Sequence, residues 1–236
     1  TTVTNLDTSK TVSVYYQGRL LSVARKSAAN AQIAKTTYAY DAHGRQLTTT
    51  DARNGATTFA YNNADQMTSV TTPAPGNGQG PQTTITAYDT ALRAWKVTQP
   101  DGTSVTNEFL LTGLLKRTFG SRTYPVGYSY DPQGRMKTMT NWSGFPSTGP
   151  RVTTWNYNAY RGFLSSKTYD GGSAGPSYTY TPAGRLLTRV WARGTNTTYA
   201  YNKAGDLSGV DYSDATSDVA YGYDRRGRQT VVTNGT

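Results

Sequence analysis

The acidic residues are the first place to look for catalytic chemistry, and they are few. The chain has 14 Asp and Glu among its 236 residues, and Glu108 is the single glutamate. Five of the thirteen aspartates sit in turn-like sequence contexts: Asp41, Asp89, Asp101, Asp131 and Asp224. No two of these carboxylates form a recognisable pair of general acid and general base. Two distant aspartates that meet in space are the one carboxylate arrangement left open, and it would suit a glycosidase-like reaction.

Histidine and cysteine offer even fewer catalytic or metal-binding possibilities. With no cysteine, the chain has no disulfide, thiolate metal site or cysteine nucleophile. A serine triad would need the lone histidine, His43, which occupies a variable turn position. We therefore predict a non-enzymatic protein with no metal and no cofactor.

The net charge of +10 raises the question of nucleic acid. Basic residues are spread evenly along the chain, and no basic run is longer than the pair Arg225 and Arg226. This distribution argues against a nucleic-acid partner. No stretch approaches the roughly 20 apolar residues that cross a bilayer, and the first residues lack the pattern of a signal sequence, so the sequence reads as an excised segment.

Composition indicates the elements that must position any site. Leu, Ile, Val and Phe make 34 of 236 residues, too few for an ordinary core, whereas 19 Tyr, 4 Trp and 41 Thr favour β-structure. We predict an all-β chain with little filled interior and no helix. The Ala-rich stretch from Ala24 to Ala34 is expected to be a hairpin loop rather than a helical turn.

An internal repeat organises the whole chain. Aromatic residues that precede a turn recur every 21 to 27 residues, in ten copies: Tyr16, Tyr40, Tyr61, Tyr88, Phe109, Tyr130, Tyr157, Tyr180, Tyr201 and Tyr223. The clearest copies read YDAHGR, YDPQGR, YTPAGR, YNKAGD and YDRRGR. We call the turn after each aromatic the YD turn.

The YD turn has a mechanical explanation. An Asp or Asn after the aromatic can accept hydrogen bonds from backbone amides, and a glycine four residues after the aromatic supplies the left-handed residue of a type I turn with a G1 bulge. Each copy is therefore a β-hairpin. The predicted structural turn residues are Tyr40, Asp41, Gly44, Arg45, Tyr130, Asp131, Gly134, Arg135, Tyr180, Gly184, Arg185, Tyr201, Gly205, Tyr223, Asp224, Gly227 and Arg228.

Ten hairpins make an antiparallel meander of about 20 strands. A sheet of that width twists and curls, so we expect a spiral, hollow wall formed by a single array over residues 1–236. Some copies depart from the pattern: Asp65 and Leu92 replace the turn glycine, the first copy is shortened, and the copy at Tyr157 has one extra residue before Gly162. These copies are expected to have distorted turns.

The tandem YDxxGR units over about residues 12–236 resemble the YD-repeat, or RHS-repeat, family. The resemblance is to bacterial RHS proteins, the shell of toxin complexes, wall-associated proteins and teneurins. It implies a β-sheet wound into a hollow shell, often around a toxin polypeptide. The family's DPxGL-type segment after the last repeat is missing here, so no self-cleavage is carried over.

Two side-chain patterns carry alternative interpretations. Aromatics two residues apart, such as Tyr128 and Tyr130, share one strand face and should stack into ladders, or else offer a platform for sugars. The candidate glycan-binding residues are Trp95, Trp142, Trp155, Tyr157 and Trp191. The Gly-Arg arginines should cover a tyrosine ring or bind the turn Asp, unless they line an anion track.

The interpretation is a structural module of a secreted or cell-surface shell that encapsulates or displays a toxin or other polypeptide. A carbohydrate-binding module is the alternative. Two longer segments, Thr71–Gln82 and Ser143–Pro150, read as surface loops away from the YD turns. Expected partners are the rest of the parent protein, an enclosed polypeptide, a glycan, and a second copy reached through exposed edge strands.

Overall fold

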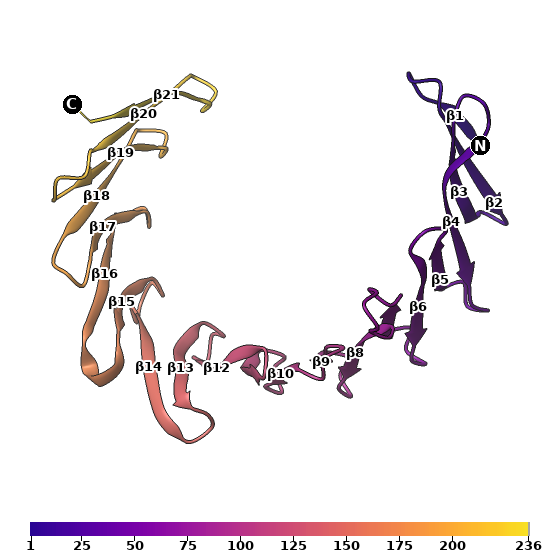
Figure 1. Ribbon diagram of the computed structural model, residues 1–236. Coiled ribbons are helices and arrows are strands. Elements are labelled where there is room, and N and C mark those ends of the chain that lie inside the picture. Colours follow the sequence, from indigo (N-terminus) through magenta and orange to yellow (C-terminus); the bar gives the residue numbers. More distant parts are fainter. Residues whose placement is uncertain (236) are drawn as a thin grey trace. The chain divides into compact units, whose positions relative to one another are not determined.

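The structure is a computed structural model that describes residues 1–235. Among them it contains 21 β-strands of one antiparallel sheet and a short 3₁₀ segment, η1 (Asp170–Gly172), so the all-β prediction is confirmed (Figure 1). The first strands are β1 (Thr2–Thr4), β2 (Lys10–Tyr16), β3 (Arg19–Lys26), β4 (Gln32–Tyr40), β5 (Gln46–Asp51), β6 (Gly55–Tyr61), β7 (Met67–Thr72), β8 (Gln82–Tyr88), β9 (Ala94–Thr98) and β10 (Ser104–Phe109). The others are β11 (Leu115–Gly120), β12 (Thr123–Tyr130), β13 (Met136–Gly144), β14 (Thr148–Tyr157), β15 (Leu164–Thr168), β16 (Ala174–Tyr180), β17 (Leu186–Val190), β18 (Asn196–Tyr201), β19 (Leu207–Tyr212), β20 (Val219–Tyr223) and β21 (Gln229–Asn234).

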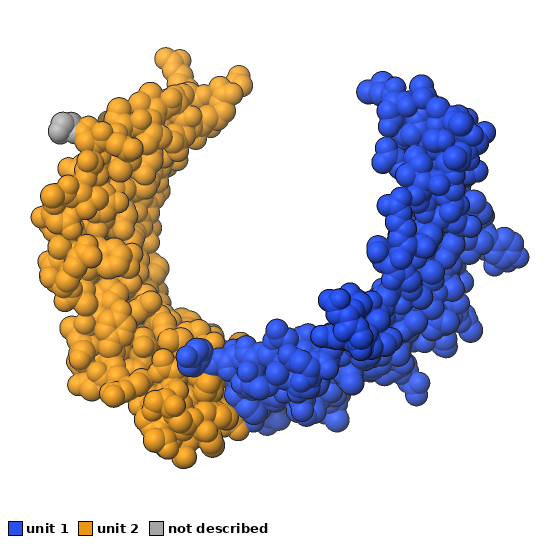
Figure 2. Space-filling view, in the orientation of Figure 1, with its two compact units in different colours: residues 1–113, 118–124 blue, residues 114–117, 125–236 orange. Residues whose placement is uncertain are grey.

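The chain divides into two compact units, which Figure 2 shows in different colours. Unit 1 comprises residues 1–113 and 118–124, and unit 2 comprises residues 114–117 and 125–236. Within each unit the contacts described between strands join strands that are consecutive in the sequence. Each unit is thus a meander of hairpins, as the repeat predicts.

One register rule relates successive copies. The residue three positions after the arginine position of one copy is paired with the residue three positions before the aromatic of the next. Thr48 faces Thr58 in this way, and Thr188 faces Thr198. The same offset holds at the other copy-to-copy pairings described within the two units. Because a slip by one residue would move every side chain to the other face, this constancy keeps equivalent side chains aligned from copy to copy.

The sheet has no filled core. The buried residues among positions 1–235 are Ser9, Ala24, Gly127, Pro176, Thr197 and Val210, and no large side chain is fully buried. Hydroxyl pairs such as Thr71 with Thr83 link neighbouring strands instead, at 2.9 Å. Contacts between neighbouring strands, rather than a hydrophobic interior, must therefore stabilise each unit.

Two of the expected loops are shorter than the sequence suggested. The stretch Ala24–Ala34 is neither helix nor long loop, because β3 and β4 extend into it and leave a tight turn at residues 27–31. Likewise most of Ser143–Pro150 belongs to β13 and β14, which close through residues 145–147. The loop at Thr71–Gln82 is real, and it spans residues 73–81 between β7 and β8.

In the first copy, the aromatic that precedes the turn lies one residue earlier than the repeat in the sequence indicated. Gln17 and Gly18 both have positive φ angles and form a two-residue turn, so Tyr16 pairs with Arg19. In the regular copies the aromatic faces the residue after the arginine, as Tyr40 faces Gln46. Tyr15 has that position in the first copy, facing Leu20. The structural equivalent of Tyr40 is therefore Tyr15, and the assignment to Tyr16 is wrong.

Candidate functional site: the junction between copies

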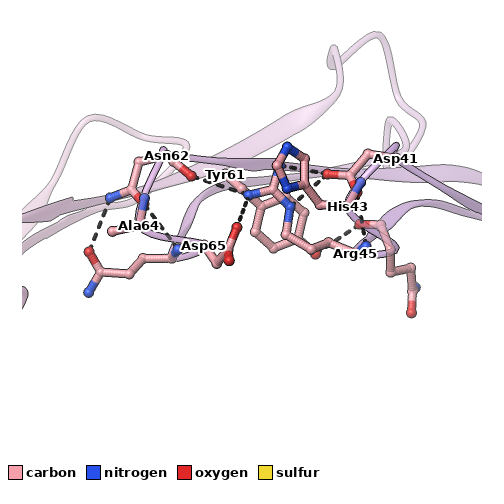
Figure 3. A network of polar contacts seen from close by, with 9 residues as sticks. Asp41, His43, Arg45, Tyr61, Asn62, Ala64 and Asp65 are labelled. Atoms are coloured by element: carbon pink, nitrogen blue, oxygen red, sulfur yellow. Dashed lines mark hydrogen bonds and ion pairs between the residues drawn. The ribbon is translucent and has the colours of Figure 1, made fainter.

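The YD turn is built around its aspartate. In the copy shown in Figure 3, Asp41 Oδ1 accepts hydrogen bonds from the amides of His43 and Arg45, each at 2.9 Å. The Arg45 Nε donates to Asp41 Oδ2 at 2.7 Å. Gly44, at φ 83°, closes the turn by donating its amide to the Asp41 carbonyl. The predicted turn chemistry is thus present, with a register shift at the aromatic, as a G1 bulge requires.

The aspartates at this position are held ionised. Burial alone would raise the pKa of Asp41, but the hydrogen bonds from the Arg45 amide and guanidinium outweigh it and lower the pKa. Asp131 shows the same balance beside Arg135. At Asp89 and Asp224 the hydrogen bond from the arginine amide is the largest effect, and it lowers the pKa. Each of these four turns therefore contains a fixed carboxylate and guanidinium pair.

The arginine also reaches the next copy of the repeat. The Arg45 guanidinium lies 4.6 Å from the ring centroid of Tyr61, and its Nη1 donates to the Asn62 carbonyl at 3.2 Å. The Arg135 guanidinium is 4.3 Å from the Tyr157 ring and donates to the Gly162 carbonyl at 2.8 Å. Both structural interpretations hold for Arg45 and Arg135, because each binds its own aspartate and covers the following copy's ring. We call this set of contacts the junction.

The aromatic hydroxyl completes the junction in the opposite direction. Tyr157 donates to the Met136 carbonyl at 2.9 Å, and Tyr130 donates to the Leu115 carbonyl at 2.8 Å. The acceptor is the residue after the arginine position of the preceding copy, and the same bond is made by Tyr40, Tyr61, Tyr88, Tyr180, Tyr201 and Tyr223. Burial raises the pKa of Tyr130 and of Tyr180, so these phenols stay protonated as donors.

The expected ladder of stacked aromatic rings is therefore wrong in its main feature. A guanidinium, rather than another aromatic ring, lies over Tyr61, Phe109 and Tyr157. Phe163 and Tyr180 are an exception within unit 2, with centroids 4.7 Å apart. Phe163 occupies the arginine position of the lengthened copy, so its ring takes the place of the guanidinium. Arg161 in turn covers the Phe163 ring at 4.7 Å.

The copies that lack the turn glycine are not distorted, which corrects the sequence-based expectation. Asp65 and Leu92 adopt the left-handed conformation, with φ angles of 60° and 63°, and keep the same turn hydrogen bonds. Asp65 also forms an ion pair with Arg45 of the preceding copy at 2.6 Å. The copy at Tyr157 does differ, because the Gly162 amide bonds the carbonyl four residues back rather than three.

Arg93 is a junction residue that the sequence reasoning missed. It pairs with Asp89 at 2.8 Å, lies 4.5 Å from the Phe109 ring and donates to the Leu110 carbonyl at 3.3 Å. Because Leu92 replaces the glycine, the Gly-Arg signal is absent there. An aspartate directly after Tyr88 and an arginine five residues after it would have identified this residue.

The candidate glycan-binding aromatics have different local surroundings. The Lys167 ammonium lies 5.0 Å from the ring centroid of Trp155 on β14. The guanidinium groups of Arg189 and Arg193 lie 3.3 and 5.7 Å from the ring centroid of Trp191. Trp142 packs edge-on against Phe145 at 5.2 Å. Tyr157 is a junction residue, and Trp95 is half-exposed in unit 1. Their role in glycan binding stays a prediction.

Among residues 1–235 no group of three or more His, Cys, Asp or Glu side chains could hold a metal ion. No described helix has the length and apolarity needed to span a membrane.

The family model of the RHS repeat matches residues 40–75, which contain the YD turns at Tyr40 and Tyr61. No curated protein sequence matches the chain.

Solved structures resemble the chain over 97% of its length. The crystal structure of TcdB2-TccC3-TEV gives a TM-score of 0.63 at 16% identity, and TcdB2-TccC3 without its hypervariable C-terminal region gives 0.63 at 17%. A Tc holotoxin pore from Photorhabdus luminescens, with a mutation in TccC3, gives 0.62 at 18%. The chain spans 14% of the length of each of these proteins. At these identities the likeness concerns the fold alone.

Proposed function

Since the chain carries an RHS repeat at residues 40–75 and has the fold of these toxin-complex proteins, we propose that it is a non-catalytic section of a shell wall that encloses or displays another polypeptide. The observation that carries the proposal is the repeated junction. Each regular arginine ties its own turn to the ring of the next copy, and the hydroxyl of that ring ties back to the preceding copy.

A wall needs such a device because the sheet lacks a core. In a one-layer repeat array, stability is close to a sum over each copy and its contacts with its neighbours. The register rule and the junctions supply those contacts at the strand ends where the YD turns lie. The opposite strand ends carry the variable turns and the loop at residues 73–81. The wall would thus keep the turns uniform at one set of strand ends and vary them at the other.

The proposed partners follow from the same reasoning. The chain would join the rest of its parent protein and would enclose or display another polypeptide. A Tc holotoxin pore is among the proteins of similar fold, and on that likeness we place the chain in a secreted or cell-surface bacterial protein. The aspartates in the YD turns are engaged by arginine, which supports a structural rather than a catalytic role.

The test uses the full parent protein. The parent with intact junctions should protect an enclosed segment from added protease, and the double variant Tyr157→Phe with Tyr201→Phe should expose that segment sooner. Tyr160→Phe is the matched control, because Tyr160 is 96% exposed and lies outside the junction. A parent in which no segment is protected, with or without the substitutions, contradicts enclosure.

The carbohydrate-binding alternative is tested separately on a glycan array. Trp155 and Trp191 both present aromatic rings flanked by basic groups, an arrangement that suits an acidic sugar. Saturable binding to the isolated chain that is lost in Trp155→Ala or Trp191→Ala would favour this alternative. Absence of binding would leave the wall function as the better explanation.

A further inference from the structure

The acidic residues of unit 2 are unevenly distributed, although the basic ones are not. Residues 132–205 contain nine Lys and Arg but a single acid, Asp170, which pairs with Arg151 at 2.6 Å. The other basic side chains of this stretch have no acid within it to neutralise them. Strands β13 to β18 therefore carry a surplus of positive charge, which attracts anionic ligands.

Two adjacent copies in this stretch place a cation opposite an aromatic ring. Trp155, two residues before the junction tyrosine, faces Lys167, whose ammonium lies 5.0 Å from the ring centroid. Tyr178 has the same position in the next copy and faces Arg189, whose guanidinium lies 6.0 Å from the ring centroid. Arg189 also packs on Trp191. Neither Lys167 nor Arg189 forms an ion pair with a carboxylate among residues 1–235.

Folding of the hairpin does not require a cation at this position. In the other copies of unit 2 the corresponding aromatic faces an apolar side chain. The pairs are Tyr128 with Met139, Tyr199 with Val210, and Tyr221 with Val232. A methionine or a valine is therefore compatible with the same hairpin. The two adjacent cations thus call for a role other than building the sheet.

A depression lies between each of the two rings and the preceding copy. The first measures about 290 Å³, and its lining includes Trp155 and Lys137. The second measures about 210 Å³, and its lining includes Tyr178, Ser165 and Arg161. Lys137 and Ser165 hold equivalent positions, two residues after the arginine position of their copies. The two depressions are therefore the same feature of the repeat, and each has an aromatic ring and a basic side chain in its lining.

The charge of both depressions suits an anion. Asp131 also lines the first depression, but it is neutralised by Arg135 at 2.7 Å. Arg161 in the second depression donates to the backbone carbonyls of Thr181 and Pro182 at 3.3 and 2.8 Å, which leaves its charge unneutralised. An acidic group entering either depression therefore meets a net positive charge.

The spacing and the rings indicate a polysaccharide. Trp155 and Tyr178 hold equivalent positions two strands apart, about 10–12 Å when the stagger of the copies along the strands is included. This separation is comparable with the length of a disaccharide. A pyranose ring has an apolar face that stacks on Trp or Tyr and hydroxyls that bond a polar lining. An acidic peptide would offer the charge but no such ring at each copy.

We propose that unit 2 binds a linear acidic polysaccharide with one carboxylate in every two sugars, laid across β13 to β17 with one disaccharide at each ring. The neutral sugars would stack on Trp155 and Tyr178, and the carboxylates would be bound by Lys167 and Arg189 together with the basic side chains of the depressions. This inference gives the carbohydrate-binding alternative a defined ligand and site. It goes beyond the wall function and does not depend on it.

The experiment is calorimetric titration of the whole chain with oligosaccharides of hyaluronan, in which glucuronate alternates with N-acetylglucosamine. Two disaccharides fill both depressions. Affinity should therefore rise roughly tenfold from the disaccharide to the tetrasaccharide, since the second unit binds as part of the same molecule. It should change little from the tetrasaccharide to the hexasaccharide, because no third copy has the same pair.

Matched substitutions test the two cations. Lys167→Met and Arg189→Val introduce the residue types that naturally face Tyr128 and Tyr199, so the hairpins should still form. Each variant should lower the affinity for the tetrasaccharide to about that for the disaccharide. Lys203→Gln is the control, because Lys203 is an exposed turn residue of the same basic stretch outside both depressions, and it should leave binding unchanged. Circular dichroism of each variant checks that the β-structure is retained.

Three results would overturn the proposal. If the neutral tetrasaccharide of chitin binds as tightly as that of hyaluronan, the cations do not select an acid. If polyglutamate or single-stranded oligothymidylate of equal charge binds as tightly, the surface recognises charge and not a sugar. If the hyaluronan tetrasaccharide does not bind, or if Lys203→Gln weakens it as much as Lys167→Met, the depressions are not the site. Protease protection of an enclosed segment is a separate measurement, so these failures leave the wall function standing.

Discussion

The hydroxyl bond of the junction can be removed from one copy without changing the ring. Tyr157 donates to the Met136 carbonyl at 2.9 Å, and its ring lies 4.3 Å from the Arg135 guanidinium. Tyr157→Phe keeps the ring and the cation–π contact and leaves the Met136 carbonyl without that donor. A bond of this kind contributes about 0.5–1.5 kcal/mol to the free energy of unfolding.

That loss can be converted to a melting temperature. For a chain of this size 1 kcal/mol corresponds to roughly 2–4 °C, so we expect Tyr157→Phe to lower the midpoint by about 1–6 °C. The effect should be local as well, because contacts in a repeat array are between neighbours. Hydrogen exchange should quicken in β13 and β14 more than in β18 and β19. Thermal melting followed by circular dichroism, with exchange mass spectrometry, measures both.

The chain offers a reciprocal test and a control. Phe109 naturally lacks the hydroxyl beneath Arg93, so Phe109→Tyr should add a bond to the Ala94 carbonyl and raise the midpoint by a similar amount. Tyr160→Phe should change neither quantity, since Tyr160 is fully exposed. The reasoning is refuted if Tyr157→Phe melts with the unmodified chain or if Tyr160→Phe lowers the midpoint equally.

Other predictions concern the turns. Leu92→Gly should raise the melting midpoint, because a left-handed leucine costs about 1–2 kcal/mol. Asp65→Gly should raise the midpoint less, since this variant also loses the ion pair with Arg45. Equal gains of the two variants in thermal melts would contradict this. Gly134→Val should destabilise the fold by more than about 1 kcal/mol through backbone strain. Gly184→Val should lower the free energy of unfolding further, because the valine Cβ would lie 3.0 Å from the Phe163 ring. Denaturant titration of both variants ranks the two losses. Stability should decline as pH falls through about 4: the pKa values of Asp41, Asp89, Asp131 and Asp224 are lowered in the folded chain, so the unfolded chain binds more protons in acid. Asp131→Asn should make a pH series of melting midpoints shallower, and an unchanged slope would remove Asp131 from that account.

The sequence was sufficient to predict the elements because their signals are local. Aromatic, aspartate and glycine recur at fixed offsets, and each offset corresponds to one position of a type I turn with a G1 bulge. The register of the first copy was missed because a two-residue turn at Gln17 and Gly18 moves the equivalent aromatic from Tyr16 to Tyr15. The pairing over Ser143–Pro150 was missed because Gly and Pro there suggested a loop, whereas they lie in or beside the longest strands.

The junction was predicted only in part because half of it is non-local. The contact of Arg45 with Asp41 is four residues apart and follows from the turn. The contact with Tyr61 depends on the register between two hairpins, which the repeat length alone does not determine. Arg93 was lost with the glycine beside it, although its aspartate and its position relative to Tyr88 were intact. The spacing from aromatic to arginine is therefore a better signal for the junction than the Gly-Arg pair.

The irregular copies show what the repeat must preserve. Where Asp65 replaces the glycine, its carboxylate binds the arginine of the preceding copy. Where Phe163 replaces the arginine, its ring packs on Tyr180 and the Tyr180 hydroxyl still reaches the Leu164 carbonyl. Where Gln66 replaces the arginine, its side-chain amide donates to the Leu92 carbonyl of the next turn at 2.6 Å. Residue identity changes in each case, but a contact from each copy to the next is kept, because in a sheet without a core that contact is what holds adjacent hairpins in one register.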